Sequence, residues 1–252
     1  MRILPYLFCF LLVNCASQLV LASNTIKIAA GQSAGLYYKT AATICLILEK
    51  DLSRKCEVIV TSGSEENTLL LQKDSVDLAL VQGNLISGQI KKVHVMYSEY
   101  LFILYKGRPV KHLNEILLKK TSIDKNSGTY SILQETTNHL KIPFSPSSTT
   151  LNLKRNFDDF CFREAEVNFY SIGYPSDLIE TTLLQCSNIN IYSFSPEESV
   201  LIPNIKSISY LGKEISTVEN KVYLTSKRDN PEIQKSIKKN FQLIKDMNNH
   251  IQ

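Results

Sequence analysis

The sequence predicts an α/β protein with a mostly parallel sheet and two lobes that face each other across a ligand cleft. Short apolar runs of strand length alternate with longer amphipathic segments of helix length, and loops of only a few residues join them. Turns rich in Gly and Ser occur in two separate sets, one in each half of the chain. The alternation predicts the fold class, and the two sets of turns predict two lobes.

The first set of turns organises the chain. An apolar strand at 26–30 leads into the glycine-punctuated loop 31–35, and an amphipathic helix follows to about residue 48. A second strand at 57–60 leads into the polar turn 61–67, in which Ser64 is expected to cap the next helix. Both turns should lie at the carboxyl end of a parallel sheet, where helix N-termini and loop amides bind ligands.

The later elements follow the same alternation. Strands are predicted at 76–81, 100–105, 166–171, 190–194 and 218–226. Helices are predicted at 67–73, 85–92, 112–118, 130–139, 152–162, 177–185 and 231–247. The second set of small-residue turns lies at 125–130 and 172–176. We expect the chain to enter the second lobe along a strand near 97–105 and to return near 195–209.

The first 22 residues are interpreted as a cleavable secretory signal peptide. Arg2 precedes an almost wholly apolar run at 3–13, and small or aliphatic residues precede a cleavage site after Ala22. The apolar run is too short to span a membrane. Cys15 raises the alternative of a lipoprotein, but Asn14 before it fits a lipidation site poorly. We therefore expect a periplasmic protein.

Charge and cysteine content restrict the function. The formal net charge of +4 is small and the basic residues are scattered along the chain, a pattern that does not indicate nucleic-acid binding. Four cysteines remain after the signal peptide, and three pairings are possible. Sequence locality favours Cys45 with Cys56 and Cys161 with Cys186. No CxxC or Cys/His cluster with zinc spacing occurs, so neither a metal nor a cofactor is expected.

These turns resemble the TAXI family, the extracytoplasmic solute receptors of TRAP transporters. The matching residues are Gly31, Gly35, Tyr37 and Tyr38, then Thr61, Gly63, Ser64 and Asn67, then Asp77 and Gln82, then Asn126, Ser127, Gly128 and Thr129, and finally Gly173, Tyr174 and Pro175. Asn126 and Tyr174 replace a Gly and a His of the family pattern. The chain is also shorter than is usual for the family around 85–95. Some members carry two similarly placed cysteine pairs.

The resemblance implies a periplasmic-binding-protein-like fold whose two lobes close on a small solute, often a carboxylate, and a TRAP membrane partner that performs the transport. Lobe I would comprise 23–98, lobe II 99–199, and 200–252 would return to lobe I with the C-terminal helix. Ligand contacts are expected from Gly35, Tyr37, Tyr38, Ser64, Asn67, Gln82, Ser127, Gly128, Thr129 and Tyr174.

Several of these residues also have a purely structural interpretation. Tyr37 and Tyr38 diverge by about 100° on a helix, so one should line the cleft while the other packs. The alternative for Ser64, Ser127 and Thr129 is that each only caps a helix. The alternative for Asn67 is that it only serves as a helix-start residue. The four histidines stand in polar contexts that are typical of surface positions.

Two other functions compete with the receptor. Residues 31–35 spell G-x-S-x-G between a strand and a helix, as in a serine hydrolase, with Ser33 as nucleophile. Asp177 would then be a candidate acid, and only His250 follows late enough to serve as the base. Because His250 lies in the chain's tail, we expect no enzyme. An exported protein without a transport role, such as a sensor or surface antigen, is the other alternative.

Overall fold

The computed structural model describes residues 25–33, 35–121, 123–146 and 153–249. Its strands are β1 (Thr25–Ala29), β2 (Lys55–Ile59), β3 (Leu78–Gln82), β4 (Lys91–Lys106), β5 (Val167–Gly173), β6 (Ile189–Ile191), β7 (Ile205–Tyr210) and β8 (Lys213–Ser226). Its helices are α1 (Leu36–Leu52), α2 (Ser64–Gln72), the 3₁₀ helix η1 (Gly83–Leu85), α3 (Leu113–Leu117), α4 (Gly128–His139), α5 (Leu153–Phe162), α6 (Asp177–Gln185), α7 (Pro196–Leu201), α8 (Pro231–Lys239) and α9 (Phe241–Asn249).

The strands form a mixed sheet in the order β2-β1-β3-β8-β4-β5, with β6 on β4 and β7 on β8. The expected parallel pairing holds for β1 with β2 and with β3. All pairs that involve β4 or β8 are antiparallel. Parallel neighbours need a crossover connection, usually a helix. β4 and β8 instead run from one lobe into the other, and they pair antiparallel with their neighbours.

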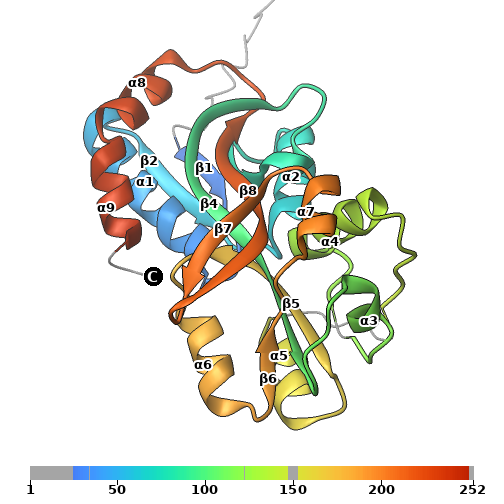
Figure 1. Cartoon of the computed structure of the whole chain (residues 1–252). Coiled ribbons are helices and arrows are strands. Elements are labelled where there is room, and N and C mark those ends of the chain that lie inside the picture. The colour runs from blue at the N-terminus through green and yellow to red at the C-terminus, as the bar shows by residue number, and fades with distance from the viewer. Residues whose placement is uncertain (1–24, 34, 122, 147–152, 250–252) are drawn as a thin grey trace, which may run out of the picture.

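β4 and β8 join the two lobes (Figure 1). The first part of β4 pairs with β8, from Lys91 opposite Ser226 onward, and its later part pairs with β5 from Glu99 to Tyr105. The prediction of a helix at 85–92 is therefore wrong, because this segment holds the last residue of η1, a turn and the first two residues of β4. The expected return near 195–209 is also wrong. That segment forms α7 and most of β7, and β8 makes the return.

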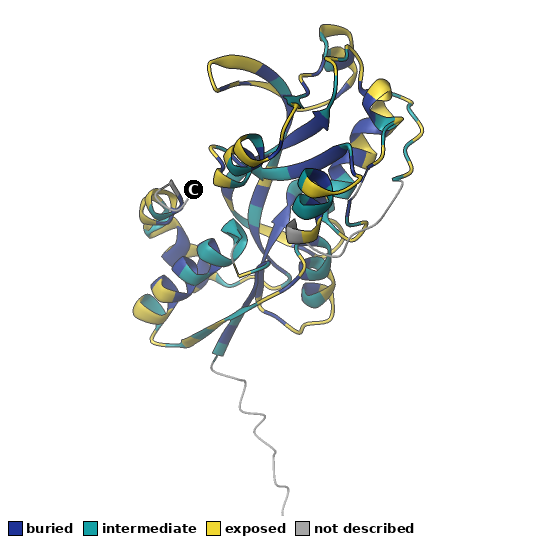
Figure 2. Cartoon of the chain, turned by 90° about the horizontal axis from the view of Figure 1, so that it is seen from below, coloured by how far each residue is buried: buried dark blue, intermediate teal, exposed yellow. Residues whose placement is uncertain are grey.

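Each lobe has its own apolar core. In the first lobe, α1, α8 and α9 cover one face of the sheet around Ile44, Leu48 and Leu224, as the helices at the upper left of Figure 1 show. In the second lobe, Phe169 and Phe102 lie in clusters on opposite faces of the sheet. In Figure 2 the strands are mostly buried and the outward faces of the helices are exposed. The chain thus has the two-lobed α/β fold that the sequence predicts.

The C-terminal segment forms two helices instead of the one predicted at 231–247. Asn240 ends α8, and its backbone oxygen accepts a hydrogen bond from the N–H of Ile244 in α9. Its side-chain amide donates to Asp51 Oδ2 at 2.9 Å. This tertiary contact holds Asn240 outside helical geometry. Pro231 begins α8, as predicted.

Two disulfides tie helices to neighbouring segments. Cys45 in α1 is bonded to Cys56 in β2, and Cys161 in α5 is bonded to Cys186 after α6, with Cα–Cα distances of 5.2 and 4.9 Å. These are the pairs that sequence locality favours. The predicted signal peptide lies outside the described residues. Among the helices that are described, none combines the length and apolar content needed to cross a bilayer.

Candidate functional site

A cavity of about 160 Å³ lies between the two lobes, and we call it the interlobe cavity. The first lobe lines it with the loops that open α1 and α2 and with the end of β3, and the second lobe lines it with α4 and β5. It gathers seven of the ten residues expected to bind ligand: Gly35, Tyr37, Ser64, Gln82, Ser127, Gly128 and Thr129.

The first-lobe wall is joined by hydrogen bonds around Ser64. Its hydroxyl lies 2.9 Å from the Tyr37 hydroxyl and accepts a hydrogen bond from the backbone N–H of Gln82 at 3.1 Å. The expectation that Ser64 caps α2 is wrong, since Gly63 occupies the cap position with a φ of +132° that disfavours a side chain. The Ser64 side chain instead connects the starts of α1 and α2 to the end of β3.

The second-lobe wall is the start of α4. Ser127 caps this helix by accepting a hydrogen bond from the N–H of Tyr130 at 3.2 Å. Thr129 Oγ1 accepts from the backbone N–H of Ser171 in β5 at 3.1 Å. Both hydroxyls therefore have structural partners while they line the cavity. The first turn of α4 leaves the N–H groups of Gly128 and Thr129 without intrahelical acceptors.

The Gln82 side chain crosses the interlobe cavity from one lobe to the other. Its Nε2 donates to Glu99 Oε2 at 2.5 Å and to Ser171 Oγ at 3.1 Å. Its Oε1 is buried and has no hydrogen-bond partner among the described residues. A Cβ placed on Gly128 would lie 1.8 Å from this oxygen, so the approach of Gln82 to α4 requires glycine at 128.

Glu99 is the cavity residue that sequence reasoning missed. It lies on β4 where the strand passes between the lobes, it is 5% exposed, and its Oε2 also accepts from Ser171 Oγ at 3.2 Å. Burial raises the pKa of Glu99 to about 7, although the hydrogen bonds from Gln82 and Ser171 oppose the increase. The available sequence signal was a lone carboxylate beside the apolar and aromatic run 100–105.

Three of the expected ligand residues lie outside the cavity lining. Tyr37 and Tyr38 both pack against the first-lobe core, but of the two Tyr37 also lines the cavity. Asn67 is fully buried, and its amide donates to the backbone oxygens of Ala30 and Leu80 at 2.5 and 2.7 Å, which ties α2 to β1 and β3. Tyr174 donates to the backbone oxygen of Ser209.

Three helices begin at the interlobe cavity, α1 and α2 on its first-lobe wall and α4 on its second-lobe wall. Their N-termini bring positive potential to both walls. The Tyr37 hydroxyl stays neutral. Burial, and after it the charge of Glu99, raises the pKa of Tyr37 well above its ordinary value. The pKa of Glu65 in α2 is raised as well, first by burial and then by Asp124. The arrangement can therefore hold a small polar solute by directed hydrogen bonds.

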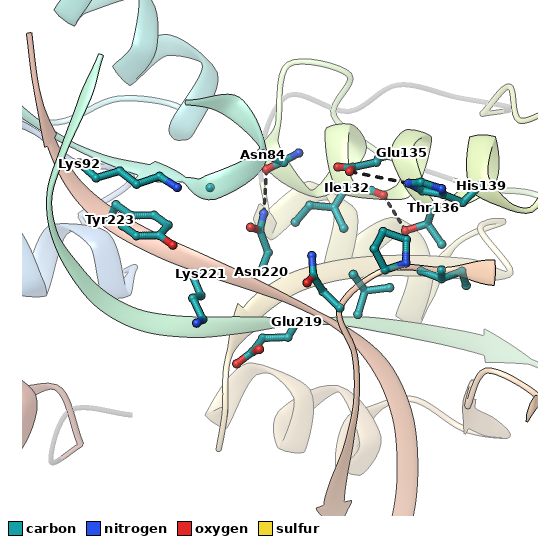
Figure 3. Close-up of a pocket in the computed structure, with 15 residues that line it drawn as sticks. Asn84, Lys92, Ile132, Glu135, Thr136, His139, Glu219, Asn220, Lys221 and Tyr223 are labelled. Carbon is teal, nitrogen blue, oxygen red and sulfur yellow. Dashed lines mark hydrogen bonds and ion pairs between the residues drawn. The ribbon is translucent and has the colours of Figure 1, made fainter. Parts of the chain in front are cut away.

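A second cavity of about 360 Å³ has residues of η1 in its lining (Figure 3). Gly83 and Asn84 line it, together with later turns of α4, the loop after α7, and β8. Asn84 joins the lobes there, donating to Ser131 Oγ at 3.0 Å and accepting from Asn220 at 2.7 Å. The Lys92 ammonium lies 4.4 Å from the centre of the Tyr223 ring.

The residues of the alternative hydrolase interpretation are dispersed. Ser33 is exposed in the turn before α1, Asp177 begins α6 in the second lobe, and His250 lies outside the described residues. Among the residues that the structure describes, no group of three or more His, Cys, Asp or Glu side chains is placed to hold a metal ion.

Sequence comparison detects a similarity confined to the first part of the chain. The model of the NMT1-like family matches residues 28–92, a segment that runs from the end of β1 through β2 and β3 and includes the loops of the first-lobe wall. No curated protein matches the sequence.

Solved structures with the same fold span nearly the whole chain. The ligand-binding core of GluR0 in complex with L-glutamate has a TM-score of 0.60 at 11% identity, over 90% of this chain and 97% of that one. PhnD1 from Prochlorococcus marinus in complex with methylphosphonate has a TM-score of 0.59 at 12% identity, over 90% of each chain. A histidine kinase sensor domain with similarity to periplasmic binding proteins has a TM-score of 0.56 at 10% identity, over 90% and 93%. The chain therefore has the periplasmic-binding-protein-like fold.

Proposed function

We propose that this protein is the extracytoplasmic receptor of a TRAP-type transporter of the TAXI class and captures a small carboxylate-bearing solute, such as an amino acid or organic acid. It would be exported by its signal peptide, act in the periplasm without catalysing a reaction, and deliver its solute to TRAP membrane subunits. Lobe I would comprise 23–98 and the part of the chain that follows the return along β8, and lobe II the residues between them.

The interlobe cavity carries this proposal. Seven residues that the TAXI resemblance selects from separate stretches of sequence line one cavity. Three helices begin around it, and a solute carboxylate can accept hydrogen bonds from such N-termini without a basic side chain. The relatives in fold that hold L-glutamate or methylphosphonate, both anionic, support a solute of this type.

A solute screen tests the proposal. The exported, disulfide-bonded protein, refolded to remove any carried-over solute, is heated with amino acids, dicarboxylates, 2-oxoacids and hydroxy acids. A solute at about 100 times its Kd adds about 2.7 kcal/mol of stability, which raises the Tm by about 5–10 °C. We expect Ser64→Ala and Gln82→Ala to reduce this shift and Lys221→Ala, in the second cavity, to preserve it. A panel that produces no shift contradicts a receptor for these solutes.

A sensory role is a second candidate, favoured by the similarity to a histidine kinase sensor domain. In that case the same cavity would bind the solute, but the closed lobes would contact a signalling protein instead of a transporter. Crosslinking in membranes with and without the identified solute distinguishes the two roles. Solute-dependent capture of a TRAP membrane subunit supports the receptor, and capture of a kinase supports the sensor.

A further inference from the structure

The charged side chains that line the interlobe cavity are all acidic. Among its described lining residues, Glu99 and Asp124 carry carboxylates, and no Lys, Arg or His is present. A simple anion in this cavity would meet two carboxylates and only helix N-termini to compensate them. The partial charge of a helix end is about half an elementary charge and is weaker than a full opposite charge. The charge distribution therefore favours a solute that also carries a positive group.

Glu99 has an unused acceptor. Its Oε2 receives hydrogen bonds from Gln82 and Ser171, two neutral donors. Its Oε1 accepts no hydrogen bond from any described residue. The groups around it from the neighbouring elements are the hydroxyls of Tyr37 and Tyr97, and burial raises the pKa of both, so they carry no charge near neutral pH. The Glu99 carboxylate thus has no cationic partner within the described part of the protein.

Gln82 holds Glu99 in place but offers the solute no open acceptor. Both hydrogens of its Nε2 are engaged, by Glu99 and Ser171, and its Oε1 is buried against Gly128 at the start of α4. A primary ammonium group brings three donors and one positive charge, which matches the free Oε1 of the Glu99 carboxylate.

We infer that the Glu99 carboxylate marks a subsite of the interlobe cavity for the primary ammonium group of the solute. This inference rests on the proposed receptor function and narrows its solute class to zwitterions. The ammonium group donates to Glu99 Oε1, and the solute carboxylate accepts from N–H groups at the helix N-termini that line the cavity. A hydroxy acid or 2-oxoacid of the same carbon skeleton lacks the positive charge and leaves Glu99 without a cationic partner.

Titration of Glu99 gives this subsite a pH signature. Burial holds the pKa of Glu99 at about 7 in the solute-free protein, so the carboxyl is largely protonated below that pH. An ammonium group pairs with the ionised form, and binding therefore releases a proton near pH 6. The affinity for an amine-bearing solute should rise from pH 6 to pH 8, whereas the affinity for a hydroxy acid should not.

The test is calorimetric titration with matched pairs of solutes, L-alanine against L-lactate and L-glutamate against L-2-hydroxyglutarate, at pH 6 and pH 8. In the pair that binds, we expect the amine-bearing solute at pH 8 to bind at least about tenfold more tightly than its hydroxy acid. This is a difference in binding free energy of about 1.4 kcal/mol. Glu99→Gln should abolish this preference and the pH dependence. Glu219→Gln, a neighbouring acid in the second cavity, should preserve both.

Each outcome distinguishes the subsite from the receptor function. Equal or tighter binding of the hydroxy acid overturns the ammonium subsite and leaves the receptor intact. Failure of all four solutes and of the broader panel to bind a protein that melts cooperatively overturns both. If Glu99→Gln does not fold, the wild type alone tests the subsite. The binding enthalpy at pH 6, measured in buffers with different ionisation enthalpies, then gives the number of protons released on binding. No proton release with the amine-bearing solute overturns the subsite.

Discussion

The interlobe cavity and the second cavity both have α4 in their lining, yet they differ in where they hold charge. The start of α4 and Gln82 line the first, whereas the later turns of α4 and Asn84 line the second. The second is larger, but its Lys92, Lys221 and Glu135 are exposed. Glu99 in the smaller cavity is buried. The contrast teaches that the larger cavity need not be the one that holds a charge away from water.

The physical basis of this contrast is solvent screening. Water and salt weaken interactions between exposed charges beyond about 10 Å at moderate ionic strength, whereas a buried charge is screened much less. A solute charge near the exposed groups of the second cavity is therefore strongly screened, whereas a solute charge beside the buried Glu99 is screened much less.

The largest effect is expected at Gly128. Gly128→Ala places a methyl group 1.8 Å from Gln82 Oε1, so Gln82 must leave its bonds to Glu99 and Ser171. We expect solute binding to be lost and stability to fall by about 1–3 kcal/mol. Urea unfolding and calorimetric titration measure the two effects.

Gly83→Ala is the matched control in the second cavity, because its Cβ would lie 3.1 Å from a Tyr223 ring carbon, a contact that small shifts relieve. Combining Gly128→Ala with Gln82→Ala should recover most of the stability. The proposed role of the Gln82 contact is wrong if Gly128→Ala binds solute and unfolds as the wild type does.

The pH dependence of stability is the next largest effect. Glu99 holds its proton up to a pKa of about 7 in the folded protein, against an ordinary value of 4.5. The folded state therefore binds more protons than the unfolded chain between these values. Its stability is fully present below about pH 4.5 and falls, by at most about 3 kcal/mol, as the pH rises to about 7.

Chemical unfolding of the solute-free protein between pH 5 and pH 8 measures this decline. We expect Glu99→Gln to remove most of the slope, and Glu219→Gln to leave it unchanged, because Glu219 belongs to the second cavity and accepts from the Ser98 hydroxyl at 2.6 Å. An unchanged slope in Glu99→Gln would show that other groups cause the pH dependence.

Asn67 supports the interlobe cavity without lining it, so its substitution tests whether a supporting residue affects solute binding. Asn67→Ala removes the amide that bonds to Ala30 and Leu80 and leaves their backbone oxygens without it. We expect a stability loss of about 2–3 kcal/mol. Because Asn67 does not line the cavity, the solute Kd should change by less than about threefold in protein that remains folded. A much larger change in Kd, with little loss of stability, would indicate direct contact.

The smallest effects are expected in the second cavity. Lys92→Ala removes the ammonium above the Tyr223 ring and should cost at most about 1 kcal/mol. Lys221→Ala should change stability by about 0.5 kcal/mol or less, since the side chain is exposed. Neither should alter solute binding. Loss of binding in either variant would contradict the contrast between the two cavities.

The sequence determined the alternation of elements and the small-residue turns. Strand and helix periodicity located most elements, because each element must bury one face and expose another. The turns at 31–35, 61–67 and 125–130 each precede a helix, and the first two follow strands of the sheet. This is why seven expected residues, far apart in sequence, line one cavity. Cysteine spacing favoured the two disulfide pairs that the structure contains.

Tertiary structure decided the roles of individual side chains. Periodicity could not choose between Tyr37 and Tyr38, and the orientation of α1 between the first-lobe core and the cavity brings Tyr37 to the lining. Asn67 became a buried connector because α2 lies against both β1 and β3. Pairing with β8 begins at Lys91, inside the segment 85–92 that was predicted to be a helix. The pKa of Glu99 depends on how far its carboxyl is removed from water, and that burial is set by β3, β5 and α1 together.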